Sequence, residues 1–193
     1  ELRYPSYPLS RWQFCGIGQF QSYDPHALAS LRSTARELGH EEWGSPPSAS
    51  ALGSYNSRPE NTDFFTRGFA EERGRFFLDW YSSALKHHGT EVLSRARAAF
   101  GDRVHLSGKV AGIHWWYRTE SHAAEVTAGY YNTNLRNAYA EIADVFAAVG
   151  NVTMDFTCME MSDSEQPREC RSSPETLVHQ VMSAAREKGI PFG

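Results

Sequence analysis

The order of helical and extended patterns along the chain is the feature that most limits its possible folds. Helical periodicity over 66–100 is followed by a short, partly β-branched run at 104–113, a helix at 139–149, a second run at 152–158 and a helix at 174–189. Parallel strands need long crossover connections, which are usually helices. This order therefore predicts an α/β fold with a parallel sheet.

The number of strands predicts that the chain is part of a larger structure. Two complete strands are expected, and the final residues, IPFG, begin a third extended segment. So few strands do not make a self-sufficient parallel sheet, because such sheets are covered on both faces by crossover helices. The lack of an initial methionine agrees with this expectation.

Earlier in the chain, Asp24 and Pro25 predict a helix start, and 44–59 has loop composition.

Charge and hydropathy exclude several classes of protein. The net charge of −4 gives no electrostatic attraction to nucleic acid or to an anionic membrane. The chain contains no long apolar run and no segment resembling a signal peptide, so we expect no transmembrane helix. We expect a soluble intracellular protein with neither nucleic acid nor membrane as a partner.

The cysteines and histidines do not form a pattern typical of a metal site. Cys15, Cys158 and Cys170 are odd in number and widely separated, which predicts reduced thiols. His87 and His88 are adjacent and so point in different directions on a helix, and no HExxH motif is present. Glycine-rich nucleotide motifs are also incomplete. We expect no metal and no cofactor.

An aromatic run, IHWWY at 113–117, follows the first predicted strand. Ligands of α/β proteins bind at the carboxyl ends of parallel strands, so this position is a candidate site. Consecutive tryptophans favour a partly wet cleft in which the rings stack on a ligand such as a sugar. The alternative is an aromatic cluster packed under a loop.

Other polar residues near the predicted strand ends are candidates for binding or catalysis. Lys109 lies in the first strand four residues from its end, where it would either serve a site or extend to solvent from a sheet edge. After the second strand, Thr157 could hold a ligand hydroxyl and Glu160 could act as an acid or base. Both could instead simply end the strand and cap the following turn.

Six strings along the chain carry a family resemblance: ELRYPSYP, YSSALKHHG, GIHWWY, HAAEVTAGYYN, DFTCMEM and DSEQP. They are colinear over nearly the whole chain, which resembles the plant-type beta-amylases, inverting glycoside hydrolases built on a (β/α)8 TIM barrel. The resemblance implies that residues 1–193 are the central portion of one catalytic barrel domain, from about the end of strand 4 to the start of strand 7, with long loops.

The resemblance also implies an activity and its residues. Such enzymes hydrolyse α-1,4-glucosidic bonds of starch and related glucans and release β-maltose from non-reducing ends, with one carboxyl group as acid and another as base. The acid corresponds to Glu1, and the base is expected beyond Gly193. Lys109, His114 and Thr157 correspond to residues that contact glucose units. The implied partners are starch, α-1,4-glucan and maltose, and the implied compartment is the plastid or the cytosol.

Three points qualify this assignment. The alternative is a beta-amylase-like protein that binds glucan or has a regulatory role without catalysis. The base glutamate distinguishes the two, because an active enzyme must have it. The isolated 193 residues are expected to be inactive, since the base lies outside them. Cys15 stands where the family is expected to have proline, and this departure affects loop shape.

Overall fold

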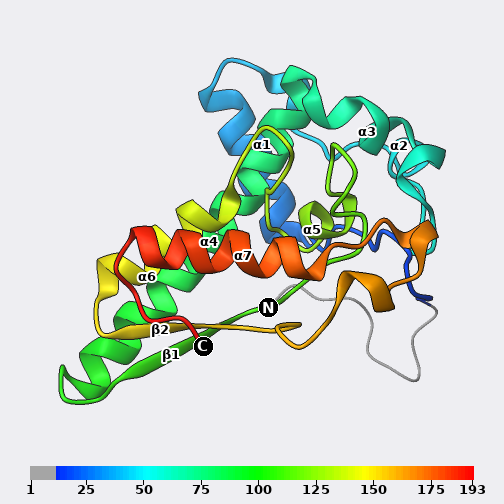
Figure 1. The fold of residues 1–193 in the computed structure, drawn as a ribbon. Helices are drawn as coiled ribbons and strands as arrows, with labels where there is room; N and C mark the ends of the chain where they lie inside the picture. Colours follow the sequence, from blue (N-terminus) through cyan, green and yellow to red (C-terminus); the bar gives the residue numbers. More distant parts are fainter. Residues whose placement is uncertain (1–11) are drawn as a thin grey trace.

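The computed structural model describes residues 12–193 as an α/β arrangement, with helices packed on one side of two parallel strands (Figure 1). Glu1 and the rest of ELRYPSYP lie outside the described residues. The α-helices are α1 (Pro25–Glu37), α2 (Ala49–Leu52), α3 (Asp63–Thr66), α4 (Glu72–Phe100), α5 (Ala123–Thr127), α6 (Ala138–Val149) and α7 (Pro174–Glu187). The strands are β1 (Leu106–Val110) and β2 (Val152–Phe156). Short 3-10 helices occur at Glu41–Trp43, Pro59–Asn61, Gly68–Ala70, Asp163–Glu165 and Arg168–Cys170.

The sheet has the parallel topology that the sequence predicts. Leu106 pairs with Val152 and Val110 with Phe156, so β1 and β2 run side by side in register. Along the other edge of β2, the Met154 N–H donates to the Pro191 carbonyl oxygen at 2.9 Å, and the Phe156 N–H donates to Gly193 at 2.7 Å. The final residues therefore extend the sheet, which confirms the prediction of two strands and the start of a third.

Two apolar clusters form the core, and α4 contributes to both. One cluster lies between the sheet and the helices α4, α6 and α7, and it includes Met154, Leu177 and Val181. The other packs the first turns of α4 against α1, α3 and the aromatic loop, and it includes Phe77 and Trp116. The helical periodicity over 66–100 corresponds in the structure mainly to α4, which runs without a break from Glu72 to Phe100.

Both strands are shorter than predicted, because their ends turn into loops. The Gly112 N–H donates to the Thr157 hydroxyl at 2.6 Å instead of continuing the β ladder. Cys158 adopts a positive φ of 62°, which ends the extended backbone after β2. The predicted loop at 44–59 contains the short helix α2, whose first turn is capped by Ser48.

The prediction of three reduced thiols is wrong for two cysteines. Cys15 and Cys170 form a disulfide across 155 residues of sequence, with a Cα–Cα distance of 5.7 Å. Sequence spacing could not reveal this pair, because only the folded chain brings the segment after Trp12 next to Arg168–Cys170. Cys158 remains a free, buried thiol.

Candidate functional site

The residues that follow β1 and β2 meet at one edge of the sheet. Besides its hydrogen bond to Thr157, Gly112 approaches the second loop so closely that a side chain there would collide with it. A Cβ on Gly112 would lie 2.4 Å from the Cys158 sulfur and 2.5 Å from the Thr157 carbonyl oxygen. Glycine at position 112 therefore allows the two strand ends to join and places Thr157 beside the loop that carries His114.

Lys109 lies on the face of the sheet opposite the apolar cluster. Its neighbour in register on β2 is Asp155, and the Ser107 hydroxyl donates to the Asp155 carboxylate on the same face. The strand is apolar on one face only, with Leu106 and Val110 buried and Lys109 exposed. An exposed lysine on this polar face fits either of the roles considered from the sequence.

His114 is buried and keeps an unused hydrogen-bonding atom. Its side chain is 5% exposed, and among the described residues its Nδ1 atom has no hydrogen-bond partner. Burial lowers the pKa of His114, and the nearby negative charge of Asp163 acts in the opposite direction. The rings of Phe14 and Trp115 lie 6.1 Å and 5.5 Å from the imidazole, centroid to centroid. A neutral imidazole that can accept or donate one more hydrogen bond is suited to a polar ligand.

The two tryptophans do not form the partly wet cleft that the sequence favoured. Trp115 and Trp116 are both buried, and Trp116 is 0% exposed. Their indole N–H groups donate to the carbonyl oxygens of Gly16 at 3.0 Å and Cys15 at 2.5 Å. The alternative of an aromatic cluster under a loop is therefore confirmed for these two residues.

The physical reason is the backbone of the loop. Consecutive residues of a strand point to opposite faces, but Trp116 has a positive φ of 61°, which turns the chain. Both rings can then be buried, because carbonyl groups of a second segment satisfy their polar edges.

The loop after β1 also forms hydrogen bonds with a second segment, the residues just before α7. The Trp116 N–H donates to the Cys170 carbonyl oxygen at 2.8 Å, and the Arg118 N–H donates to Arg171 at 3.0 Å. The Ser173 N–H in turn donates to the His114 carbonyl oxygen at 3.0 Å. Residues 114–118 thus run between the segment after Trp12 and the segment before α7, and the disulfide joins those two segments.

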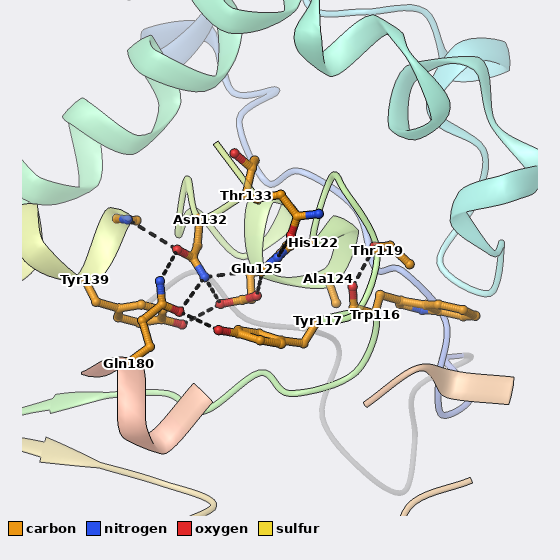
Figure 2. Close-up of polar contacts among 12 residues, drawn as sticks. Trp116, Tyr117, Thr119, His122, Ala124, Glu125, Asn132, Thr133, Tyr139 and Gln180 are labelled. Carbon is orange, nitrogen blue, oxygen red and sulfur yellow. Dashed lines mark hydrogen bonds and ion pairs between the residues drawn. The ribbon is translucent and has the colours of Figure 1, made fainter. Parts of the chain in front are cut away.

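A buried polar network next to this loop was not identified from the sequence. Figure 2 shows Glu125 at its centre, and this carboxylate is 0% exposed. Glu125 accepts hydrogen bonds from Tyr139 at 2.7 Å and Asn132 at 3.1 Å, and it lies 2.6 Å from Nδ1 of His122. The string HAAEVTAGYYN contains three of these residues. The sequence signal for the network was therefore the presence of several polar side chains close together in this string.

The network extends to α7 and back to the aromatic loop. Gln180 exchanges hydrogen bonds with Asn132 at 3.0 Å in both directions, and the Tyr117 hydroxyl donates to Gln180 at 3.0 Å. Burial, together with the charge of Glu125, raises the pKa of Tyr117 to about 12. These groups satisfy one another inside the protein, so the network supports the loop and offers no open site.

The described residues also bear on the other candidates. Glu160 is exposed in the loop after β2. In residues 12–193, no group of three or more histidine, cysteine or acidic side chains is arranged to hold a metal ion. Across the same residues, none of the helices combines the length and apolar character that crossing a bilayer requires.

Comparisons with known proteins agree on one group of relatives. The profile of glycosyl hydrolase family 14 matches residues 1–193. Beta-amylase of Medicago sativa is 48% identical over 98% of this chain and 38% of its own length. Beta-amylase 1, chloroplastic, of Oryza sativa subsp. japonica is 51% identical over 98% of this chain and 36% of its own length.

A solved structure shows a similar fold. The crystal structure of the catalytic domain of beta-amylase from Paenibacillus polymyxa superposes with a TM-score of 0.77 at 30% identity, and the match covers 100% of this chain and 47% of that one. The chain thus has an α/β fold similar to part of that catalytic domain.

Proposed function

The chain belongs to glycosyl hydrolase family 14, and on this basis we propose that the protein hydrolyses α-1,4-glucosidic bonds of starch-type glucans and releases β-maltose from their non-reducing ends. The observation that carries the proposal is the match of the family profile over residues 1–193. Relatives named beta-amylase, with 48% identity over nearly the whole chain, support it. Starch, soluble α-1,4-glucan and maltose are the proposed partners.

We further propose that the residues form the central part of one catalytic (β/α)8 barrel domain, from about the end of strand 4 to the start of strand 7. Support comes from the parallel pairing of β1 and β2 and from the final segment at the outer edge of β2. The helices α6 and α7 each follow the pattern of a barrel crossover, because each connects one extended segment to the next.

The proposed chemistry requires two carboxyl groups. In an inverting glycosidase, a carboxylic acid protonates the leaving oxygen while a carboxylate activates water on the opposite face of the sugar, with the two groups about 6.5–9.5 Å apart. We assign the acid to Glu1 and expect the base on a glutamate outside residues 1–193. Glu1 must remain protonated near the working pH, so its pKa has to be raised by burial or by a nearby negative charge.

We propose as substrate contacts the three residues that the family resemblance indicates, Lys109, His114 and Thr157, and their donors and acceptors support this choice. Within residues 12–193, Nδ1 of His114 has no hydrogen-bond partner, and it can bond a sugar hydroxyl. Thr157 accepts the Gly112 N–H, which leaves its own hydroxyl hydrogen to donate. Lys109 adds three donors from the polar face of the sheet. Sugar hydroxyls both donate and accept, so this combination suits a glucose unit.

We propose that the protein acts in the plastid or the cytosol. Two relatives, from rice and from Arabidopsis thaliana, are named chloroplastic. A fluorescent fusion of the full-length protein, imaged in leaf cells, will show plastid or cytosolic signal, and signal confined to the cell exterior would contradict the proposal.

The activity is tested on the full-length protein with soluble amylose, by measuring maltose and its anomeric form. We expect β-maltose from the wild type and a loss of about 100- to 10,000-fold in Glu1→Gln, the range typical of a general acid. Glu187→Gln, an exposed residue at the end of α7, is the matched control and should retain wild-type activity.

Different results separate the two hypotheses. Unchanged activity in Glu1→Gln would remove the acid role from Glu1. A wild-type protein that binds amylose but releases no maltose would replace catalysis with the non-catalytic alternative.

A further inference from the structure

One carboxylate in the loop between β2 and α7 joins three segments of the chain. Oδ2 of Asp163 accepts a hydrogen bond from Arg118 Nη2 at 2.6 Å and another from the Ser173 hydroxyl at 2.9 Å. Oδ1 accepts from the Glu175 N–H at 3.1 Å. Asp163 therefore connects its own loop to the loop after β1 and to the start of α7.

Asp163 performs the capping function that the residue before α7 does not. Ser173 occupies the N-cap position, but its side chain caps no backbone N–H of the helix. Asp163, ten residues earlier in the chain, accepts the Glu175 N–H instead and places a negative charge at the positive end of the helix dipole. Burial acts to raise the pKa of Asp163, but the bonds from Glu175, Ser173 and Arg118 outweigh it and lower the pKa, so the group stays ionised.

The same contacts lead directly to His114. Ser173, which Asp163 holds through its hydroxyl, donates its N–H to the His114 carbonyl oxygen at 3.0 Å. Arg118, which Asp163 holds through its guanidinium, lies four residues after His114 on the same loop. Asp163 thus bonds both Ser173, which holds the His114 carbonyl oxygen, and Arg118, which lies further along the His114 loop.

We propose that Asp163 is a positioning residue for substrate binding, which fixes the buried imidazole of His114 by holding Ser173, the partner of the His114 carbonyl oxygen, and Arg118, on the same loop as His114. The inference rests on the proposed function, in which His114 contacts a glucose unit. Asp163 itself need not touch the sugar. Its loop begins with Thr157, so Asp163 joins the two loops that carry the proposed contact residues.

The electrostatic link provides a readout that a purely structural cap would not move. The charge of Asp163 acts to raise the pKa of His114 against the effect of burial. Replacing Asp163 by asparagine removes this charge, so the pKa of His114 should fall. A change in helix stability alone leaves that titration where it is.

The test uses the full-length protein and two matched variants. Asp163→Asn removes the charge at the proposed position, and Asp144→Asn removes a charge from a surface pair with Lys188, between α6 and α7. For each we measure KM and kcat with soluble amylose. We also follow the His114 titration by NMR of carbon-13-labelled histidine, with His114→Gln to assign the signal.

We expect Asp163→Asn to raise KM about tenfold, the effect of losing one charged hydrogen-bonded contact, with a smaller change in kcat. Its His114 pKa should be lower than in the wild type, and Asp144→Asn should match the wild type in both measurements. Should Asp163→Asn fail to fold, Ser173→Ala serves instead. It keeps the N–H that binds His114 but loses the hydroxyl bond to Asp163, and it should raise KM less.

The outcomes separate this inference from the proposed function. If the wild type is active and Asp163→Asn keeps both the wild-type KM and the wild-type His114 titration, Asp163 is not a positioning residue. If the wild type releases no maltose, the proposed function fails, and the substrate role of Asp163 fails with it. The His114 titration then still reports whether Asp163 acts on His114.

Discussion

The disulfide between Cys15 and Cys170 makes the clearest prediction about stability. It closes a loop of 155 residues, and in the chain-entropy treatment a crosslink of that span restricts the unfolded chain by about 5 kcal/mol. Native disulfides typically contribute somewhat less than this limit. The double variant Cys15→Ala, Cys170→Ala should therefore lower the free energy of unfolding by about 2–5 kcal/mol.

Removal of the disulfide should mainly affect the loops at the strand ends, because of where it lies. The Cys15 carbonyl oxygen accepts the Trp116 indole N–H, and the Cys170 carbonyl oxygen accepts the Trp116 backbone N–H. The crosslink thus joins the two segments that enclose this buried ring. Without it, each segment still binds Trp116, but the two can separate more easily.

The assay is urea unfolding of the full-length protein, followed by tryptophan fluorescence, with and without a dithiol reductant. The reduced wild type should unfold at the same urea concentration as the double variant, and the reductant should leave the double variant unchanged. Peptide mapping of the unreduced protein should recover the Cys15 and Cys170 peptides crosslinked. Equal unfolding free energies for oxidised and reduced wild type would refute the reasoning.

Two further predictions concern the junction of the strand ends. Gly112→Ala should destabilise the protein by about 1–3 kcal/mol, since the added carbon overlaps Cys158 and Thr157, and urea unfolding with no loss of stability would contradict this. Burial raises the pKa of Cys158 to about 12, so at pH 8 iodoacetamide should label this thiol slowly in the folded protein and rapidly in urea, and equal rates measured by mass spectrometry would show that the thiol is accessible.

Local signals were sufficient to predict much of the fold. Asp24 accepts hydrogen bonds from the N–H groups of His26 and Ala27, as the Asp-Pro pair suggested, and α1 begins at Pro25. Apolar side chains at helical spacing predicted α6 and α7, and the short apolar run between them predicted β2. These features depend on residues close together in sequence, so one amino-acid sequence is sufficient to predict them.

Contacts between distant segments account for what the sequence did not reveal. The burial of Trp116 depends on the carbonyl oxygen of Cys15, which lies 101 residues away, and on a positive φ that no pattern predicts. The disulfide depends on the same approach of two loops. The ionic capping of α7 by Asp163 is likewise decided by how the loops fold back.

The sequence predicted where two of the candidate residues lie, and their binding roles stay predictions. His114 and Thr157 do lie on adjoining loops at the strand ends, because parallel strands bring their carboxyl ends to one edge of a sheet. Nothing in the string GIHWWY indicates that Gly112 is the residue that allows this approach. The role of Gly112 becomes clear only in the folded chain, where a Cβ at this position would lie 2.4 Å from the Cys158 sulfur.

The long helix α4 links the unfolding of the two apolar clusters. Its 29 residues extend about 43 Å, so a single rod has its first turns in one apolar cluster and its last turns in the other. Neither cluster can melt fully while α4 stays anchored in its neighbour. The two cores should therefore unfold as one cooperative unit, and damage at the aromatic loop should lower the protection of the sheet at the far end of the helix.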